Sequence, residues 1–151
     1  MEVNESLLKE LSKKAINIRR NIIEMVYMAS SGHPGGALSI VDILTILYFY
    51  EMKVDLSNSK DENRDRFVLS KGHASPALYA TLAEKGFIEK EELRKFRSIN
   101  SLLQGHPDMK KIPGVDMTTG SLGQGLSAAN GMALAGKLDQ KSYRVYCMLG
   151  D

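Results

Sequence analysis

The sequence has a single cysteine, Cys147, and this scarcity excludes two kinds of site. One cysteine can form neither an internal disulfide nor a thiolate metal cluster. Because Cys147 lies in the apolar run YRVYCML, the sequence predicts a buried thiol in a reducing compartment. The first residues, MEVNESLLKELSKKA, are acidic and then amphipathic, and they lack the apolar core of a secretory signal. Together these features predict a cytoplasmic protein.

An excess of charge of one sign and long apolar runs are lacking as well. The 20 Lys and Arg residues nearly balance the 18 Asp and Glu residues, and no block of like charge stands out. The composition therefore gives no reason to expect binding to nucleic acid or to a membrane. The longest apolar stretch, ILTILYFY, is too short to span a bilayer. A content of 43% hydrophobic and 25% charged residues is typical of one globular domain.

The spacing of apolar residues and of stop signals predicts five helices, at about residues 6–29, 39–52, 75–86, 90–96 and 122–138. Ser39 and Asp42 have the spacing of a capping box, and Ser75 is placed to cap the third helix. The last helix is rich in glycine, serine and alanine, which predicts close packing against another helix, for example one of a partner subunit. The buried stripe expected on the first helix consists of Leu8, Leu11, Ala15, Ile18, Ile22, Val26 and Ala29.

Two short apolar runs, at residues 66–70 and 143–149, predict strands. Helices that alternate with such strands predict an α/β fold with an open, mostly parallel sheet flanked by helices, and ligands of such folds bind beyond the carboxyl ends of the strands. Residues 97–121 are irregular, and a loop of this length is more often functional than a mere connector. Because the chain stops directly after a strand, we expect residues 1–151 to be the N-terminal portion of a larger domain.

All three histidines follow a glycine, in the tripeptides Gly32-His33-Pro34, Gly72-His73-Ala74 and Gly105-His106-Pro107. A following proline restricts His33 and His106 to extended backbone, and histidine can move protons near neutral pH. Each histidine alone could be an ordinary loop residue, but the repeated context favours a shared site. A three-histidine zinc site has little support, because the separations match no short ligand spacing.

The glycine-rich segment TTGSLGQG, residues 118–125, opens the last predicted helix. It matches neither a Walker loop nor a dinucleotide fingerprint, but free backbone N–H groups at a helix start favour anions and polar rings. Asp151 follows the second predicted strand, where an aspartate can ligate magnesium but is more often a helix cap.

Taken together, these motifs resemble the N-terminal thiamine-diphosphate-binding domain of transketolases. The resemblance covers about residues 18–151 and rests on SGHPGG, RDRFVLSKGHASPALYA, GHPD…IPGVDMTTGSLGQGLS and LGD, in this order. The serine in GSLGQG, where long eukaryotic forms usually carry proline, is similar to the separately encoded N-terminal subunits of some bacteria and archaea. The resemblance implies the thiamine-diphosphate-binding fold. It also implies transfer of a two-carbon ketol unit from a ketose or ketose phosphate to an aldose or aldose phosphate, as in the pentose phosphate pathway.

The resemblance also implies roles for the three histidines. His33 matches the family's histidine that contacts the substrate and helps to move protons at the reacting carbons. His106 matches the histidine that hydrogen-bonds a hydroxyl of the donor sugar. His73 matches the histidine near the diphosphate of the cofactor.

The implied cofactors are thiamine diphosphate and Mg²⁺, with Ca²⁺ or Mn²⁺ able to replace the magnesium. Gly120, Ser121 and Leu122 match the loop that touches the aminopyrimidine ring of the cofactor, and Asp151 matches the first metal ligand of the family's Gly-Asp-Gly…Asn motif. The remainder of that motif and the residues of the family's other domain fall beyond Asp151. The implied partners are therefore a complementary C-terminal transketolase half and a second copy, in a dimer or a heterotetramer, and the implied substrates are sugar phosphates.

Two alternatives stay open at this point. One is another thiamine-diphosphate enzyme, such as 1-deoxyxylulose-5-phosphate synthase or the homodimeric pyruvate dehydrogenase component, although RDRFVLSKGHA and GHPD fit transketolase better. The other is a truncated, non-catalytic homologue that acts as an interaction scaffold. Because half of the metal motif is missing, we expect the 151 residues alone to bind thiamine diphosphate weakly or not at all.

Overall fold

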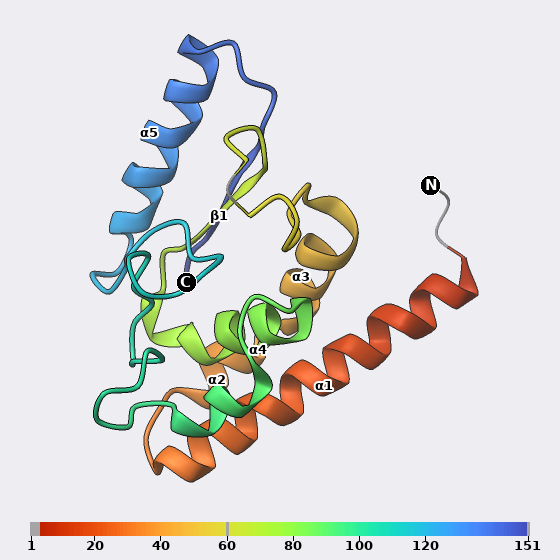
Figure 1. Cartoon of the computed structure of the whole chain (residues 1–151), viewed down its shortest axis with the longest axis vertical. Coiled ribbons are helices and arrows are strands. Elements are labelled where there is room, and N and C mark those ends of the chain that lie inside the picture. The colour runs from red at the N-terminus through yellow and green to blue at the C-terminus, as the bar shows by residue number, and fades with distance from the viewer. Residues whose placement is uncertain (1–3, 60, 151) are drawn as a thin grey trace.

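The structure, a computed structural model, describes residues 4–59 and 61–150 (Figure 1). Two strands pair in parallel, with Arg66 opposite Val145 and Leu69 opposite Met148, so the predicted α/β class with a parallel sheet is confirmed. The elements in chain order are α1 (Glu5–Ala29), α2 (Pro34–Leu38), α3 (Val41–Ile46), the π-helical turn η1 (Leu47–Glu51), β1 (Arg66–Leu69), the 3₁₀ turn η2 (Gly72–Ala74), α4 (Ser75–Lys85), the 3₁₀ turn η3 (Lys90–Lys95), α5 (Gln124–Leu138) and β2 (Val145–Met148).

Helix α1 lies across α3 and α4 and supplies one side of the core (Figure 1). The Asn4 side chain caps its start by accepting a hydrogen bond from the Leu7 N–H. Its buried residues are Ala15, Ile18, Ile22 and Met25, so the predicted stripe is right in its centre. It is wrong at Leu8, which is half exposed because the first turns of α1 extend past the rest of the fold. No helix in the described ranges is long and apolar enough to cross a bilayer.

The segment after α1 forms two short helices where the sequence predicted one. Pro34 starts α2, so Ser39 ends that helix, and the expected capping box is wrong. The Ser39 hydroxyl donates back to the Gly36 carbonyl, and the Asp42 carboxylate accepts a hydrogen bond from Arg19. Helix α3 then widens into η1, which ends one residue before the predicted limit and places the Tyr48 ring in the core.

Helix α4 is the centre of the core, since every residue from Ser75 to Ala83 is buried. Its predicted end at Gly86 is confirmed, but the predicted cap is wrong: Ser75 is the first helical residue, and its hydroxyl donates to the Gly105 carbonyl at 2.8 Å. The bond ties α4 to the irregular segment 97–121. The expected helix at residues 90–96 forms as the 3₁₀ turn η3.

Helix α5 packs against the two strands, not against another helix of the described structure (Figure 1). A Cβ atom built on Gly125 would lie 2.9 Å from Ser70, and one built on Gly136 would lie 2.7 Å from the Tyr143 ring. The small residues on this face therefore serve close approach to the sheet and to the segment before β2. Gly131 is on the other side of α5, where an added Cβ would meet nothing within 4 Å.

Cys147 is half-buried on β2, which corrects the prediction of a buried thiol. All four residues of β2 are half-buried, because the described elements cover this strand less completely than they cover β1. Burial raises the pKa of the Cys147 thiol, which keeps it protonated near neutral pH.

Two acidic residues join distant segments around the starts of the strands. Asp65 accepts hydrogen bonds from the backbone N–H groups of Lys53 (2.8 Å) and Arg144 (2.7 Å). Asp116, in the long irregular segment, accepts one from the Phe67 N–H at 2.8 Å and forms an ion pair with Arg64. The irregular segment is therefore fixed to the sheet just before it reaches the glycine-rich turn at residues 118–125.

Candidate functional site

The candidate site lies at the carboxyl ends of β1 and β2, where the strands continue into Ser70-Lys71 and Leu149-Gly150. Because the strands are parallel, these two ends lie side by side. They border a cavity of about 630 Å³. The lining residues come from α2 and the turn after it, from the two strand ends and from the start of α5, and they are Gly35, Gly36, Ser39, Ser70, Lys71, His73, Leu122, Gly123, Leu149 and Gly150.

One of the three histidines, His73, lines this cavity, and His33 and His106 lie near His73. The rings of His33 and His73 meet edge to face, with their centroids 5.1 Å apart. The His106 ring lies over Gly120, where an added Cβ would be 3.6 Å from its Cγ. The pKa of His73 is lowered, first by burial and then by the positive charges of His33, Lys71 and His106. His73 is therefore neutral at neutral pH, with one ring nitrogen free to accept a hydrogen bond.

The position before His73 has no room for a side chain, which explains why it is a glycine. A Cβ on Gly72 would lie 2.9 Å from the carbonyl carbon and oxygen of Thr119. Real Cβ atoms do not approach so closely, so any larger residue would push the glycine-rich turn away from the end of β1. Because Gly72 has no side chain, the glycine-rich turn can lie against the end of β1, and Gly120 lies close to the segment that carries His73.

The glycine before His106 makes room for a guanidinium group. A Cβ on Gly105 would lie 2.8 Å from Nη2 of Arg97. The same Arg97 donates a hydrogen bond to the hydroxyl of Ser31, two residues before His33. Arg97 thus lies between the segments that carry His33 and His106 and relates the two histidines to each other.

Only some residues of the glycine-rich turn line the cavity. Leu122 and Gly123 line it, and the Gly123 N–H donates to the Ser70 carbonyl at 3.3 Å. Gly120 faces His106 instead, while the Ser121 carbonyl accepts a hydrogen bond from the Gln124 N–H. Ser121 itself is exposed and does not line the cavity. Asp151, the predicted metal ligand, lies outside the described residues.

Sequence reasoning missed Lys71 and Ser70, which supply buried polar groups to the cavity. Lys71 is 8% exposed, and its Nζ donates to the Ser39 hydroxyl at 3.3 Å. Ser70 is 1% exposed, and its hydroxyl has no hydrogen-bond partner among the described residues; the buried Thr119 hydroxyl has none either. The signal available in the sequence was position, because both residues directly follow a predicted strand and precede Gly72-His73.

These residues fit a bound diphosphate. A buried cation and a wall partly made of glycines are what a diphosphate group requires of its surroundings. The described residues do not form a comparable set of metal ligands. Within residues 4–59 and 61–150, no group of three His, Cys, Asp or Glu side chains is placed to hold an ion.

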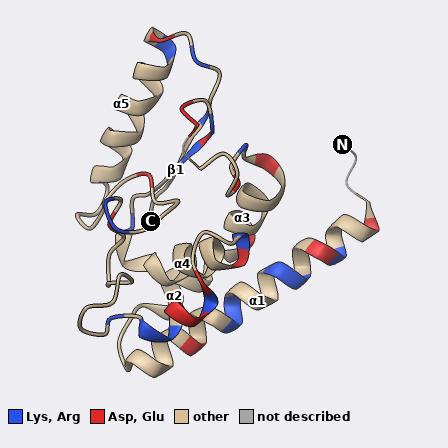
Figure 2. Cartoon of the chain, in the orientation of Figure 1, with Lys and Arg blue, Asp and Glu red and all other residues tan. Residues whose placement is uncertain are grey.

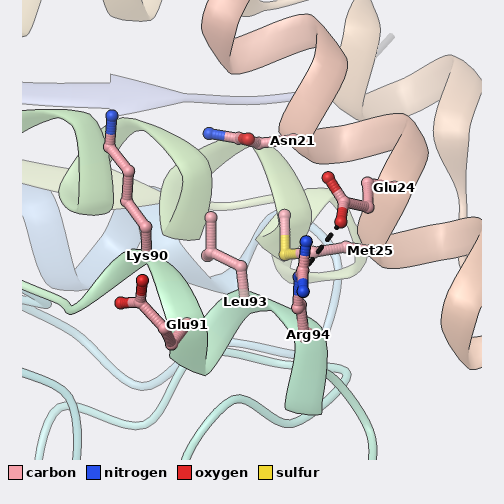
Figure 3. A pocket seen from close by; sticks show the side chains of 7 residues that line it. All are labelled: Asn21, Glu24, Met25, Lys90, Glu91, Leu93 and Arg94. Atoms are coloured by element: carbon pink, nitrogen blue, oxygen red, sulfur yellow. Dashed lines mark ion pairs between the residues drawn. The ribbon is translucent and has the colours of Figure 1, made fainter.

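A second cavity, of about 270 Å³, lies between α1 and η3, away from the histidines (Figure 3). Its polar side chains include the basic Lys90 and Arg94 and the acidic Glu24 and Glu91, and Arg94 forms an ion pair with Glu24 at 3.2 Å. The charges balance, so this cavity offers no preference for an anion or a cation.

A model of one protein family matches almost the whole chain. It is described as the transketolase thiamine diphosphate binding domain, and it matches residues 11–148. The chain belongs to the transketolase family. The match includes the three Gly-His segments, the glycine-rich turn and both strands of this member.

Two transketolase subunits are among the similar proteins. A subunit of the apulose-4-phosphate transketolase of Phocaeicola vulgatus is 47% identical over 133 residues, which are 88% of this chain and 47% of that protein. A subunit of the 6-deoxy-6-sulfo-D-fructose transketolase of a Clostridium species is 47% identical over 142 residues, which are 94% of this chain and 52% of that protein. The chain therefore spans about half the length of these transketolase subunits, and the expected similarity to subunit forms is confirmed.

A solved transketolase has the same fold over the whole chain. The transketolase of Campylobacter jejuni superposes with a TM-score of 0.87 at 37% identity, and the match covers 100% of this chain and 24% of that one. At this identity the likeness extends beyond fold to sequence. The shared part is about a quarter of the C. jejuni enzyme.

Proposed function

We propose that residues 1–151 are the N-terminal part of the diphosphate-binding domain of a transketolase, which transfers a two-carbon ketol unit from a ketose to an aldose. The observation that carries this proposal is the convergence of His33 and His106 on His73, which lines a cavity at the carboxyl ends of parallel strands. Binding a partner does not require three neighbouring imidazoles and a buried lysine at such a cavity. The enzyme is therefore favoured over the scaffold.

His73 would lie near the diphosphate of thiamine diphosphate, and the turn at residues 120–122 would contact its aminopyrimidine ring. Asp151 is proposed as a ligand of Mg²⁺, which neutralises diphosphate oxygens, and Ca²⁺ or Mn²⁺ would serve there as well. When bound, thiamine diphosphate supplies the electron sink that allows a carbon–carbon bond next to a carbonyl to break. The residues of this chain orient the reactants and move protons.

His33 is proposed as the residue that exchanges protons with the substrate oxygens. It occupies the N-cap position of α2 with a non-helical backbone, and Pro34 fixes the chain on its C-terminal side. The side chain is exposed, so it can reach a substrate that enters the cavity. His106 is proposed to hydrogen-bond a hydroxyl of the donor sugar, and its position over Gly120 limits the directions in which its ring can turn.

The substrate is proposed to be a ketose with an anionic group. Two relatives are named for such sugars, one a phosphate and the other a sulfonate. The complementary C-terminal half would supply the remaining contacts, in an assembly that also contains a second copy of this chain. We expect this assembly in the cytoplasm.

The outer face of α5 is proposed to contact the partner. Leu134 and Leu138 are 60% and 84% exposed on this helix. Lys137 is its only charged residue, and Figure 2 shows the length of α5 free of other charges. An exposed apolar face without charged residues is typical of a surface that another protein covers.

Gly131→Leu is expected to affect assembly and stability in opposite directions. In the free chain the new side chain meets open space and replaces a helical glycine, so it should stabilise the chain by up to about 1 kcal/mol. In the assembly it should cost about 1–3 kcal/mol through overpacking. Melting curves of the free chain and sedimentation with the complementary half measure the two effects.

Two further variants serve as controls for Gly131→Leu. Gly131→Ala should keep the assembly, because its methyl group is small. Ala129→Leu should instead unfold or destabilise the free chain, because Ala129 is buried against the sheet. Unchanged sedimentation of Gly131→Leu with the complementary half would show that this face of α5 is not the contact.

The proposed function is tested by mixing the chain with its complementary half, thiamine diphosphate and magnesium. Each member of a panel of ketose phosphates and sulfonated ketoses is offered with an aldose acceptor, and the products are identified by mass spectrometry. The expected products are an aldose two carbons shorter than the donor ketose and a ketose two carbons longer than the acceptor aldose. If the two halves associate but no donor is consumed, the interaction scaffold is the better description.

A further inference from the structure

Lys71 has an unusual environment for a lysine. It is 8% exposed, although lysine is almost never so deeply buried without an acidic partner. Its only hydrogen bond from Nζ to a described residue is to the neutral hydroxyl of Ser39, at 3.3 Å. None of the ion pairs between described residues includes Lys71.

The side chain of Lys71 crosses the floor of the candidate site. Its Cδ lies 3.9 Å from the place where a Cβ on Gly150 would be, so the aliphatic part runs along the end of β2. The residue lines the cavity of about 630 Å³ together with Ser39 and Ser70. Ser39, which accepts the hydrogen bond from Lys71, is exposed, so its hydroxyl is open to a ligand in the cavity.

An ammonium group removed from water without a counter-charge destabilises the ligand-free protein. Such a residue is explained when a ligand brings the missing negative charge. The neighbouring groups at the strand ends are hydroxyls and glycines, which can approach phosphate oxygens closely and do not repel them. The occupant of this part of the cavity should therefore be an anion.

We propose that Lys71 binds the terminal phosphate of thiamine diphosphate, with the hydroxyl of Ser39 as a further donor, and so makes the protein select the diphosphorylated cofactor. This role rests on the proposed function. The same chemistry would suit the phosphate of a sugar substrate, but Lys71 lies at the carboxyl ends of the strands on the buried side of the site. The cofactor, which must be held before any sugar reacts, is the ligand that fits this depth.

The test uses Lys71→Met, which keeps the length of the side chain and removes its charge, and Lys71→Arg, which keeps the charge. Lys9→Met, on the exposed side of α1, is the matched control. Each protein, free and assembled with its complementary half, is titrated with inorganic diphosphate, thiamine diphosphate, thiamine and fructose 6-phosphate. Binding is followed by calorimetry or, where it is weak, by NMR.

We expect Lys71→Met to lose about 10- to 100-fold in affinity for diphosphate and thiamine diphosphate, as is typical for a hydrogen bond to a charged group. Affinity for thiamine should not change. Lys71→Arg should retain most of the affinity, and Lys9→Met all of it. A second readout needs no ligand: because Lys71→Met removes a buried charge that has no acidic partner among the described residues, it should raise the melting temperature of the ligand-free chain.

The outcomes separate this inference from the proposed function. If Lys71→Met binds thiamine diphosphate as tightly as the parent, or if its melting temperature falls, the inference is wrong and the proposed function stands. If the largest loss is for fructose 6-phosphate, the anion belongs to the substrate, and the inference is again wrong. If inorganic diphosphate binds in a Lys71-dependent way while thiamine diphosphate does not bind, the anion site is real and the proposed cofactor is wrong. If the parent binds neither, both fail.

Discussion

Replacing His33 with alanine is expected to slow ketol transfer by about 10²- to 10⁴-fold, the usual contribution of a general acid–base group. The fold should survive, because the His33 side chain is exposed and makes no capping hydrogen bond to α2. Its one ring contact among the described residues is with His73, and the centroids of the two rings are 5.1 Å apart. Exposed side chains of this kind change stability by no more than about 0.5 kcal/mol when they are replaced.

The measurement is kcat of the assembled enzyme at saturating cofactor, with a melting curve of each variant. Pro34→Ala is a useful companion, because it leaves the imidazole in place and only frees the backbone that orients it. It should lower kcat by less than His33→Ala. A kcat for His33→Ala within about threefold of the parent would make His33 an ordinary residue at the start of a helix.

The fold was predictable where a local pattern decided it. Helix α1 and the end of α4 at Gly86 follow from apolar spacing and a glycine stop, and both strands follow from short apolar runs. Two of the errors fall on serines. Ser39 and Ser75 both stand where a capping residue belongs, yet their hydroxyls donate to the carbonyls of Gly36 and Gly105.

The error at Ser75 comes from the tertiary structure, and the error at Ser39 from a local signal. Gly105 lies 30 residues after Ser75, so no window along the sequence contains the bond that determines what Ser75 does. The turn at Pro34 is a local signal that was read as a helix stop, although proline is equally common in the first turn of a helix. It starts α2, and Ser39 then comes at the wrong end of a helix to serve as a cap.

The candidate site was predictable only where its residues carry a local signal in the sequence. The Gly-His repetition pointed to the histidines, because each tripeptide carries its backbone restriction within itself. Lys71 was missed, since its burial depends on Ser39 from the turn after α2 and on Gly150 from the end of β2. That Lys71 is buried with no acidic partner within residues 4–59 and 61–150 is recognised only once the three segments are seen together.

Asp116→Ala is expected to destabilise the chain by about 3–5 kcal/mol, because it leaves the charge of Arg64 without its partner in a largely buried place. The side chains of Asp116 and Arg64 are 7% and 15% exposed. Asp116 also accepts the hydrogen bond from the Phe67 N–H, so the substitution leaves the first residues of β1 with an unsatisfied donor. The remaining bonds of Arg64, to the carbonyls of Ser59 and Asp65, should keep the loss toward the lower end of this range.

The loss should appear as a melting temperature lowered by roughly 6–15 °C, at about 2–4 °C per kcal/mol for a domain of this size. Asp42→Ala is the matched control: it also breaks an arginine–aspartate pair, but the Asp42 side chain is 71% exposed, and exposed pairs contribute at most about 1 kcal/mol. Because Asp116 anchors the segment that leads to Thr119 and Gly120, its loss should also weaken cofactor binding at temperatures where the chain is still folded. Equal shifts for the two variants would mean that Asp116 and Arg64 are as well solvated as a surface pair, and that the irregular segment is held by other contacts.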